Sequence, residues 1–287
     1  MQGRNWGRWG DTDERGALNL VDEVAVRRGL ASVRHGRPIS LGLPVRAGAA
    51  PRAVIRPDVQ HLMLRDGGDY AAGLAERPGY GYADDLLVLA CHATTHLDAL
   101  AHVWQDALMW NGYSAHEVTS RGAARAGIDA AGPVVTRGIL LDLADDLDDG
   151  DPVSRDLVAG KLEEHGVVPE PGDALLVRTG WLARWRQGRA TADTWPGFDA
   201  SVTELVDRFD LAVLGADTIS TEQNPSADPR CALPVHIALI RDRGVPLLEL
   251  LDLEELAAQK PTTFLLVLSP LRIAGGTGSP LAPTAVL

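Results

Sequence analysis

The sequence predicts an α/β protein, and three observations support that fold class. Short runs of apolar and β-branched residues recur along the chain at the length of buried strands. Segments with helix-capping residues at their ends separate these runs, and this alternation is typical of α/β proteins. The chain has 287 residues, of which 45% are hydrophobic, and shows no internal repeat or long linker. We therefore expect a single domain over residues 1–287.

The first expected elements are an N-terminal arm and a short helix. Residues 1–20 mix tryptophans and charged residues among glycines, which favours an ordered arm over a disordered tail. Residues 22–30 predict a helix in which Asp22 is the N-cap, because an aspartate side chain accepts hydrogen bonds from the free backbone N–H groups of the first turn. Gly29 is expected to end this helix.

Two strand-like runs follow. Residues 39–45 alternate in polarity and contain Pro44, which suits an edge strand because proline cannot donate to a neighbouring strand. Residues 86–90 form an apolar run that leads directly into a histidine-rich stretch. Since α/β proteins usually place their chemistry at strand ends, this stretch is the first candidate site.

The second half of the chain predicts two helices and several buried strands. The helix over residues 154–165 has Ser154 as its N-cap and a glycine just past its end. A further helix over residues 234–243 is opened by a proline and closed by Gly244. Strands are expected at residues 137–143, 174–179, 211–215, 245–251 and 263–268.

Charge and composition argue against several classes of partner. A formal net charge of −12 is unsuited to binding nucleic acid, whose partners concentrate positive charge. The apolar run at residues 264–268 is far too short to cross a bilayer, and the N-terminus lacks the apolar core of a signal peptide. Two cysteines, Cys91 and Cys231, do not make a disulfide framework. We expect a cytoplasmic protein with a small-molecule substrate and neither a nucleic-acid nor a membrane partner.

The histidine-rich stretch is CHATTHLDALAH, residues 91–102. His92, His96, Asp98 and His102 stand at spacings that neither regular element brings together. A helix would place Asp98 roughly 200° round from His96, and a straight strand would hold the outer pair about 33 Å apart. If the four groups converge, the chain must bend here, with one part extended and another coiled. Such a bend, rich in imidazoles and a carboxylate, predicts a metal site.

The residue types in this stretch suit a catalytic metal. Neutral imidazole suits Zn, Mn, Fe and Ni, and a carboxylate oxygen can complete the set or bridge two ions. Three protein ligands leave a position open for water. A fourth group, His102, is then free to transfer protons. The competing interpretation is a set of core or surface histidines without a common role. Cys91, next to His92, is interpreted as a small apolar side chain and not as a ligand.

The remaining histidines differ in how well the sequence supports a role at the site. His236 opens the helix after its proline, and Glu249 follows on the next expected strand, so the two could meet over one pocket. His61 lies in an arginine-rich apolar segment and is a candidate for contact with substrate. Structural or pocket-lining roles are the expectation for the other three, His35, His116 and His165.

At this point the sequence resembles the metal-dependent cyclase-family hydrolases, which include bacterial kynurenine formamidase and isatin hydrolase. HATTHLDALAH (residues 92–102) is similar to the family pattern H-x-G-T-H-x-D-x-P-x-H. The resemblance extends along most of the chain, through the segments GRWGDTDERGALN, RGILLDL, LLVRTGW, LGADTIS, HIALIRDRGVPLLELLDLEEL and GGTGSPLAP. Thr94 stands for the family's glycine and Leu100 for its proline, so the loop at the metal can differ in shape, and with it the substrate.

The resemblance implies a fold, a cofactor and a set of roles. The fold is a compact swivelling β/β/α domain around a mixed β-sheet, assembled as a homodimer or homotetramer. His102 is implied as the proton-transfer residue, and Asp98 as a bridge wherever two metals bind. The cofactor is a divalent metal, Zn or Mn, as one or two ions held by His92, His96, Asp98, His236 and Glu249.

The resulting functional hypothesis is a metal-dependent hydrolase that uses a metal-activated water to cleave an amide (a formamide or cyclic amide) or a lactone. Trp104, Trp110 and Tyr113 follow the motif closely and, with His61, are candidate substrate-binding residues, although a core role for the three aromatic rings is the competing interpretation. Two alternatives remain open. One is a metal-dependent cyclase or dehydratase in natural-product biosynthesis, and the other is a non-catalytic protein that binds a metal or a small molecule.

Overall fold

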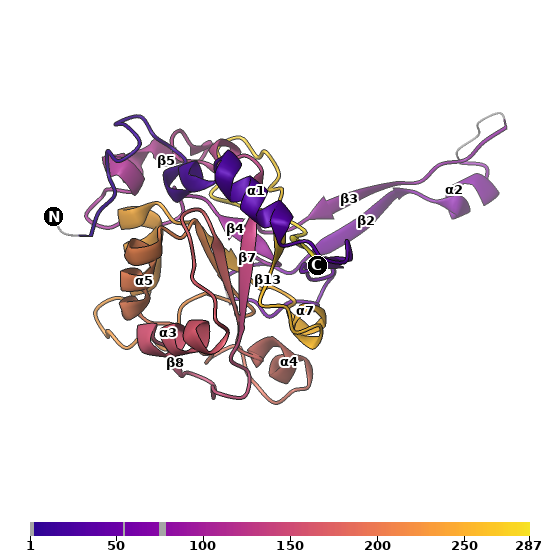
Figure 1. Ribbon diagram of the computed structural model, residues 1–287. Coiled ribbons are helices and arrows are strands. Elements are labelled where there is room, and N and C mark those ends of the chain that lie inside the picture. The colour runs from indigo at the N-terminus through magenta and orange to yellow at the C-terminus, as the bar shows by residue number, and fades with distance from the viewer. Residues whose placement is uncertain (1–2, 54, 75–78) are drawn as a thin grey trace.

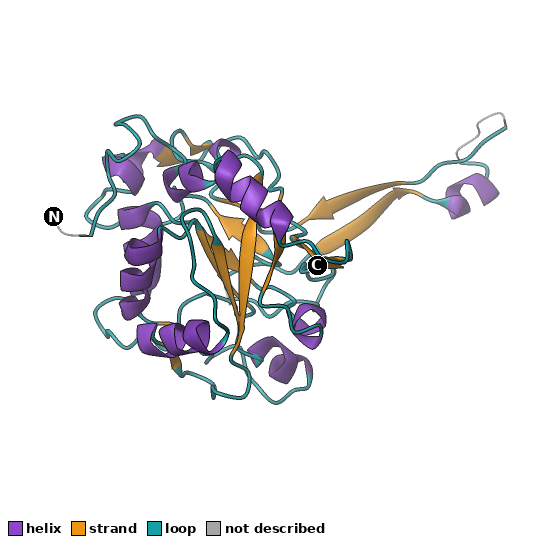
Figure 2. Ribbon diagram, viewed as in Figure 1, coloured by secondary structure: helices purple, strands orange, loops and turns teal. Residues whose placement is uncertain are grey.

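The computed structural model describes residues 3–53, 55–74 and 79–287, and it shows a mixed α/β architecture (Figures 1 and 2). In this described part of the chain, nine strands form one sheet. The four central strands β7, β9, β11 and β12 run parallel, and every other pairing in this sheet is antiparallel. In spatial order the strands are β1 (Pro38–Ser40), β15 (Thr284–Val286), β13 (Thr263–Leu268), β7 (Val134–Asp142), β9 (Ala174–Arg178), β11 (Val213–Ala216), β12 (Leu247–Glu249), β4 (His96–Asp98) and β14 (Gly278–Pro280).

Short helices and small two-stranded pairs surround this sheet. The pairs are β2 (Gln60–Arg65) with β3 (Asp84–Val88), β5 (Val118–Thr119) with β6 (Gly122–Ala123), and β8 (Pro152–Val153) with β10 (Gly197–Phe198). The helices are α1 (Glu23–Ala31), α2 (Gly67–Ala71), α3 (Arg155–Glu164), α4 (Trp181–Arg186), α5 (Thr203–Phe209), α6 (Pro234–His236) and α7 (Glu254–Ala258), with a π-helix at Ile237–Arg241. Single 3-10 turns lie at Gly16–Leu20, Trp110–Gly112, Ala115–Glu117, Ile128–Ala130 and Ala200–Val202.

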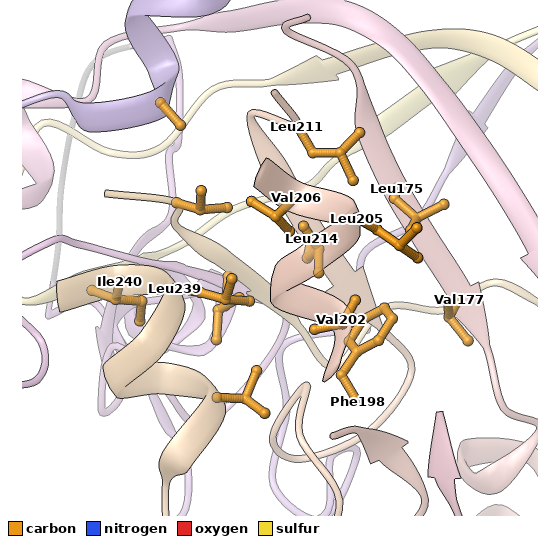
Figure 3. Packing of buried hydrophobic residues seen from close by; sticks show 14 of the residues in the cluster. Leu175, Val177, Phe198, Val202, Leu205, Val206, Leu211, Leu214, Leu239 and Ile240 are labelled. Carbon is orange, nitrogen blue, oxygen red and sulfur yellow. The ribbon is translucent and has the colours of Figure 1, made fainter. Parts of the chain in front are cut away.

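Both faces of the sheet are buried, which explains the continuous apolar runs in its central strands. In β7, Ile139 and Leu141 belong to the cluster that includes residues of α3 and α5, whereas Leu140 belongs to a separate cluster with the C-terminal strand. Figure 3 shows part of the first cluster, which includes Val206 of α5, Leu239 of the π-helix and Leu214 of β11. The sheet is therefore a rigid platform with hydrophobic packing on each side.

The helix expected at residues 22–30 is present, with one correction. Asp22 is the N-cap and accepts the backbone N–H groups of Val24 and Ala25 at 2.8 and 2.9 Å. The helix does not end at Gly29 but continues to Ala31. Gly29 serves a different purpose, because a Cβ at this position would stand 2.6 Å from the backbone of Thr136 on β7. The glycine allows α1 to pack closely on the sheet.

The helices expected in the second half are confirmed. The Ser154 side chain accepts the backbone N–H of Leu157 at the start of α3. Pro234 is the first residue of α6, and Gly244, with a φ of +69°, closes the helical segment. The interior of that segment changes to π-helix, which the sequence did not predict. The five buried strands are present as β7, β9, β11, β12 and β13, each within a few residues of its expected bounds.

The N-terminal residues 3–20 lie along the body of the protein. The Trp6 indole donates to the backbone oxygen of Arg241 at 2.7 Å. Arg8 forms a bidentate ion pair with Asp210 at 2.6 and 2.8 Å. Both tryptophans of this segment pack against the main hydrophobic cluster. These contacts tie the segment to parts of the chain more than 200 residues away.

The two early strands differ from each other in burial. The strand expected at residues 39–45 is confirmed as an edge strand, but β1 covers only Pro38–Ser40. The apolar run at residues 86–90 contributes to β3, which pairs with β2 in a hairpin that projects from the body (Figure 1). All residues of β3 are exposed. Among the described residues, no helix is both long and apolar enough to span a bilayer.

Candidate metal centre

The histidine-rich stretch bends as its spacing predicts. His92 lies in a turn, and His96 and Asp98 follow on β4, the second strand from one edge of the sheet. The two side chains are two residues apart on a strand and so share one face, while Leu97 between them is fully buried on the other. Glu249 of β12 is the cross-strand partner of His96, which brings a second carboxylate to the same face.

Five side chains converge on this face. Oδ1 of Asp98 lies 3.4 Å from Nε2 of both His92 and His96. Glu249 lies 3.3 Å from His96 Nε2 and 3.4 Å from His236 Nε2. The Nε2 atom of His236 is also 3.7 Å from Oδ2 of Asp98. Asp98 therefore stands between two groups of nitrogen atoms, as the implied bridging role requires.

The centre contains buried polar atoms that the protein leaves without hydrogen bonds. Nε2 of His96 and both oxygens of Asp98 are buried and have no hydrogen-bond partner within the described structure. Leaving such atoms unpaired is costly, because each has lost its contacts with water. A divalent cation would satisfy all three at once. His92, His96 and Asp98 place one ligand atom each within 4.8 Å of one another, so this donor set fits a metal ion.

The imidazoles are held so that their Nε2 atoms face the carboxylates. The Nδ1–H group of His96 donates to the backbone oxygen of Thr94 at 2.8 Å, which leaves Nε2 as the ring atom that could bind a metal. His92 lies against Gly278 of β14, where a Cβ atom would overlap its Nε2. Thr94, which stands for the family's glycine, contributes its backbone oxygen, which accepts the hydrogen bond from His96.

Burial and charge set the protonation of the centre. Burial lowers the pKa of His92 to about 3 and also lowers the pKa of His102, so both imidazoles are neutral. Burial also opposes charge on His96, but the neighbouring Asp98 and Glu249 outweigh it and raise the His96 pKa to about 9. For Asp98, the nearby histidines overcome the effect of burial and lower its pKa to about 2. The carboxylate is therefore ionised and suited to a cation.

Glu222 is a site residue that sequence reasoning missed. It is buried and accepts the backbone N–H groups of Val235 and His236 at 3.0 Å each. It also accepts a hydrogen bond from Nδ1 of His236, which directs Nε2 of that ring toward Asp98 and Glu249. Glu249 is held in turn by the backbone N–H and hydroxyl of Thr221, at 2.7 and 2.9 Å. No local spacing connects Glu222 to the histidine stretch, so only the fold reveals it.

His102 lies beside His92 and Asp98 at the edge of a cavity. The residues before it form a turn. The His102 ring stacks on His92 with centroids 4.2 Å apart, and its Nε2 is 4.0 Å from Asp98. The cavity has a volume of about 440 Å³ and is lined by His102, Trp104, Leu233 and Ile237, among others.

The four candidate substrate-binding residues lie in different places in the structure. Trp104 is 48% exposed and lines the cavity beside His102. Trp110 is fully buried, with its indole directed at Asp13, so the expectation that it binds substrate is wrong and the core interpretation holds. Tyr113 packs against the main hydrophobic cluster under Arg125. His61 is on the projecting hairpin, paired with Asp85 at 2.7 Å.

The other histidines stay outside the cluster. His165 ends α3, His116 lies in the 3-10 turn Ala115–Glu117, and His35 bonds through its backbone to the C-terminal Leu287. None of these three occurs in the groups of possible metal ligands found among the described residues.

Comparison with known proteins agrees with this geometry. The family model described as "Putative cyclase" matches residues 39–223. The chain belongs to the cyclase family. A crystal structure described as a novel cyclase is 32% identical, covers 100% of both chains and superposes with a TM-score of 0.91. The resemblance inferred from the motif is thereby confirmed, as is the mixed α/β fold class.

More distant structures share the fold of this cyclase-family protein. Isatin hydrolase A from Labrenzia aggregata, solved with benzyl benzoate, is 21% identical, with a TM-score of 0.68 over 89% of this chain and 94% of its own. A structure described as a predicted metal-dependent hydrolase from Bacillus stearothermophilus is 19% identical, with a TM-score of 0.57 over 87% of this chain and 97% of its own. Comparison with curated protein sequences finds no match.

Proposed function

We propose that this cyclase-family protein is a metal-dependent hydrolase that cleaves an amide (a formamide or cyclic amide) or a lactone. The observation that carries the proposal is the set of buried, unpaired atoms of His96 and Asp98 beside an open cavity. Structural relatives described as hydrolases support the reaction class. The unpaired oxygen atoms of Asp98 would bind a cation, and the cavity beside His102 would hold a carbonyl substrate.

The proposed ligands divide into two groups around Asp98. His92, His96 and Asp98 would hold one ion, and Asp98, His236 and Glu249 would complete a second. Zn and Mn both accept this mixture of imidazole and carboxylate. A bound divalent ion supplies Lewis acidity, which lowers the pKa of a water molecule and polarises a carbonyl oxygen.

His102 is the proposed proton carrier. Burial lowers its pKa, so the ring is neutral and can accept a proton from water and return it to a leaving amine or alkoxide. The ring is 22% exposed at the cavity, whereas the His96 side chain is fully buried. Its Nε2 also belongs to a possible ligand group with Asp98 and His236. Metal content separates the two roles, because a ligand variant loses metal and a proton-carrier variant does not.

The cavity favours a small substrate with an apolar or aromatic part. Trp104, Leu233 and Ile237 provide apolar surface next to His102. A volume of about 440 Å³ lies within the range typical of pockets for small molecules. We propose that Trp104 packs against the apolar part of the substrate while its carbonyl points toward Asp98.

The test is metal analysis of the purified protein followed by a panel of formamides, cyclic amides and lactones. We expect bound Zn or Mn, and products whose summed mass exceeds that of the substrate by one water: a single ring-opened product from a cyclic amide or a lactone, and an amine plus formate from a formamide. Ring closure or dehydration would lower the mass instead and would replace the proposed reaction. A matched control is His116→Ala, which removes an exposed histidine outside the cluster and should keep full metal content. Metal-free protein that cannot be reconstituted would contradict the proposal.

A further inference from the structure

A tight turn follows Trp104 and carries two residues in a left-handed backbone conformation. Asp106 has a φ of +52° and Ala107 a φ of +59°. On either side of them, Gln105 and Leu108 exchange two backbone hydrogen bonds, at 3.1 and 3.0 Å, so the chain reverses within two residues. Such turns favour Asn-Gly, because the side chain of an alanine is crowded in the left-handed region. The Asp-Ala turn therefore needs contacts from elsewhere in the fold to hold it.

Arg241 supplies two of those contacts. Its Nε atom donates to the backbone oxygen of Leu108 at 2.8 Å, and its Nη2 atom donates to that of Gln105 at 3.1 Å. The backbone N–H of Ala115 supplies another, to the oxygen of Ala107 at 2.9 Å. The arginine is only 1% exposed, so water does not compete for its two bonds. Its planar fork holds both ends of the turn in a geometry that the ammonium group of a lysine does not reproduce.

Arg241 belongs to a segment that forms another part of the cavity wall. It is the last residue of the π-helix that begins at Ile237, and Ile237 lines the cavity together with Trp104. The buried side chains of Leu239 and Ile240 anchor this helix in the main hydrophobic cluster (Figure 3). The guanidinium group therefore connects the wall that carries Trp104 to a wall that is fixed in the core.

The N-terminal segment also holds Arg241. The Trp6 ring centroid lies 5.0 Å from the guanidinium carbon, and the Trp6 indole donates to the Arg241 backbone oxygen at 2.7 Å. Asp242 accepts a hydrogen bond from the same guanidinium group, and its backbone oxygen accepts the N–H of Asn5 at 2.8 Å. The side chain of Arg241 is thus fixed on several sides and can impose its position on the turn.

We propose that Arg241 is a positioning residue that holds Trp104 at the substrate cavity by clamping the turn that follows it. Trp104 is 48% exposed, so burial alone does not fix its ring. The inference rests on the proposed function for the contact between Trp104 and substrate, whereas the clamp concerns contacts within the fold. The effect is expected on KM and not on kcat, because the clamp acts on the cavity wall and not on the metal centre.

The first test is the kinetics of Arg241→Lys. We expect KM to rise about 10-fold, while kcat and metal content change by less than about 2-fold. The matched control is Arg243→Lys, at a buried arginine whose hydrogen bonds go to Asp207 at 2.7 and 2.8 Å and to the backbone of Ala238 at 2.9 Å. This control should keep the wild-type KM. An unchanged KM in Arg241→Lys, or an equal rise in Arg243→Lys, overturns the proposal.

Two further backgrounds separate the clamp from a general loss of stability. Asp106→Asn with Ala107→Gly gives the turn its favoured sequence, and in Arg241→Lys it should return KM to within about 3-fold of the wild-type value. In the Trp104→Ala background, Arg241→Lys should leave KM unchanged, since the clamp acts through that ring. A rise in KM that persists in either background contradicts the clamp.

Amide hydrogen exchange provides a readout that needs no substrate. Residues 104–108 should exchange at least about 10-fold faster in Arg241→Lys than in the wild type, while the strand at residues 134–142 keeps its protection. If Arg241→Lys does not fold, the same comparison with Trp6→Ala, which removes the ring over the guanidinium group, should show the same direction. An inactive wild type with this response refutes the proposed reaction and supports the clamp. Equal exchange of the turn in variant and wild type overturns the clamp, whatever the activity.

Discussion

Histidine–aspartate pairs occur in two contrasting settings in this chain, the buried centre around Asp98 and the exposed hairpin around Asp85. On the hairpin, His61 and Asp85 approach to 2.7 Å, with side chains that are 54% and 61% exposed. At the centre, His96 and Asp98 are fully buried yet stay 3.4 Å apart, and their facing atoms form no hydrogen bond within the described structure. The closer pair is thus the less consequential one, because water already satisfies exposed polar groups and screens their attraction.

The two regions also reverse the usual distribution of polarity. The centre keeps charged groups in the interior, where a cation would balance them, and the hairpin keeps apolar groups exposed at the surface. In both regions, the groups that lack a partner indicate the chemistry of what would bind there. Substitutions in each region can therefore test this contrast.

The largest effect is expected for Asp98→Ala. Because Asp98 lies between both groups of proposed ligands, its loss should abolish metal binding and activity while the fold survives. Added Zn or Mn should raise the melting temperature of the wild type but not of this variant, since only a protein that binds the ion gains stability from it. Elemental analysis and thermal melting provide the measurements. Full metal content in the variant would remove Asp98 from the ligand set.

The next effect concerns His102. His102→Asn should retain the metal and lose about 10²–10⁴-fold in kcat, the usual contribution of general acid–base catalysis. Metal content and steady-state kinetics of the same preparation separate the outcomes. A metal-free variant would make His102 a ligand, and an unchanged rate would refute its role as proton carrier.

The two tryptophans after the motif should respond in opposite ways. Trp110→Ala removes a fully buried ring and should lower the free energy of unfolding by about 3–5 kcal/mol. Trp104→Ala should leave stability nearly unchanged and raise KM, because its ring lines the cavity. Denaturant melts and kinetics of both variants test the assignment. Equal losses of stability would place Trp104 in the core as well.

A moderate effect is expected for Glu222→Gln. The glutamine keeps the size of the side chain but loses the charge that orients His236, so metal affinity should fall about 10–100-fold. Competition with a chelator measures this change directly. Glu255→Gln, at an exposed position on α7, is the control and should leave affinity unaltered. Unchanged affinity in Glu222→Gln would show that the helix backbone alone positions the histidine.

The sequence was most informative where the chemistry is local. His92, His96 and Asp98 lie within seven residues, and their spacing alone indicated a bend with a shared site. Glu249 required the family resemblance, because its position opposite His96 depends on the pairing of β12 with β4. Glu222 gave no signal, since it acts through a helix N-terminus that begins 12 residues later in the chain.

Burial was the property that the sequence predicted least well. Trp110 and Trp104 are both aromatic residues close to the motif, yet one is fully buried and the other is 48% exposed. The apolar run before the motif predicted a strand, and β3 is a strand, but its residues are all exposed. Apolar character indicates that burial of a residue is favourable. It does not specify whether the fold of the chain buries that residue.

The smallest expected effect is that of Asp85→Asn, which completes the contrast with Asp98. The substitution removes the charge from an exposed pair while leaving the size of the side chain and the apolar side chains of the hairpin unchanged. Exposed ion pairs gain little, because water and salt screen them and two mobile side chains must be ordered. The free energy of unfolding should therefore change by less than about 0.5 kcal/mol. Metal content and activity should equal those of the wild type. Denaturant melts at low and high salt would measure the difference, and a loss as large as that of a buried pair would show that the His61–Asp85 pair is covered in solution.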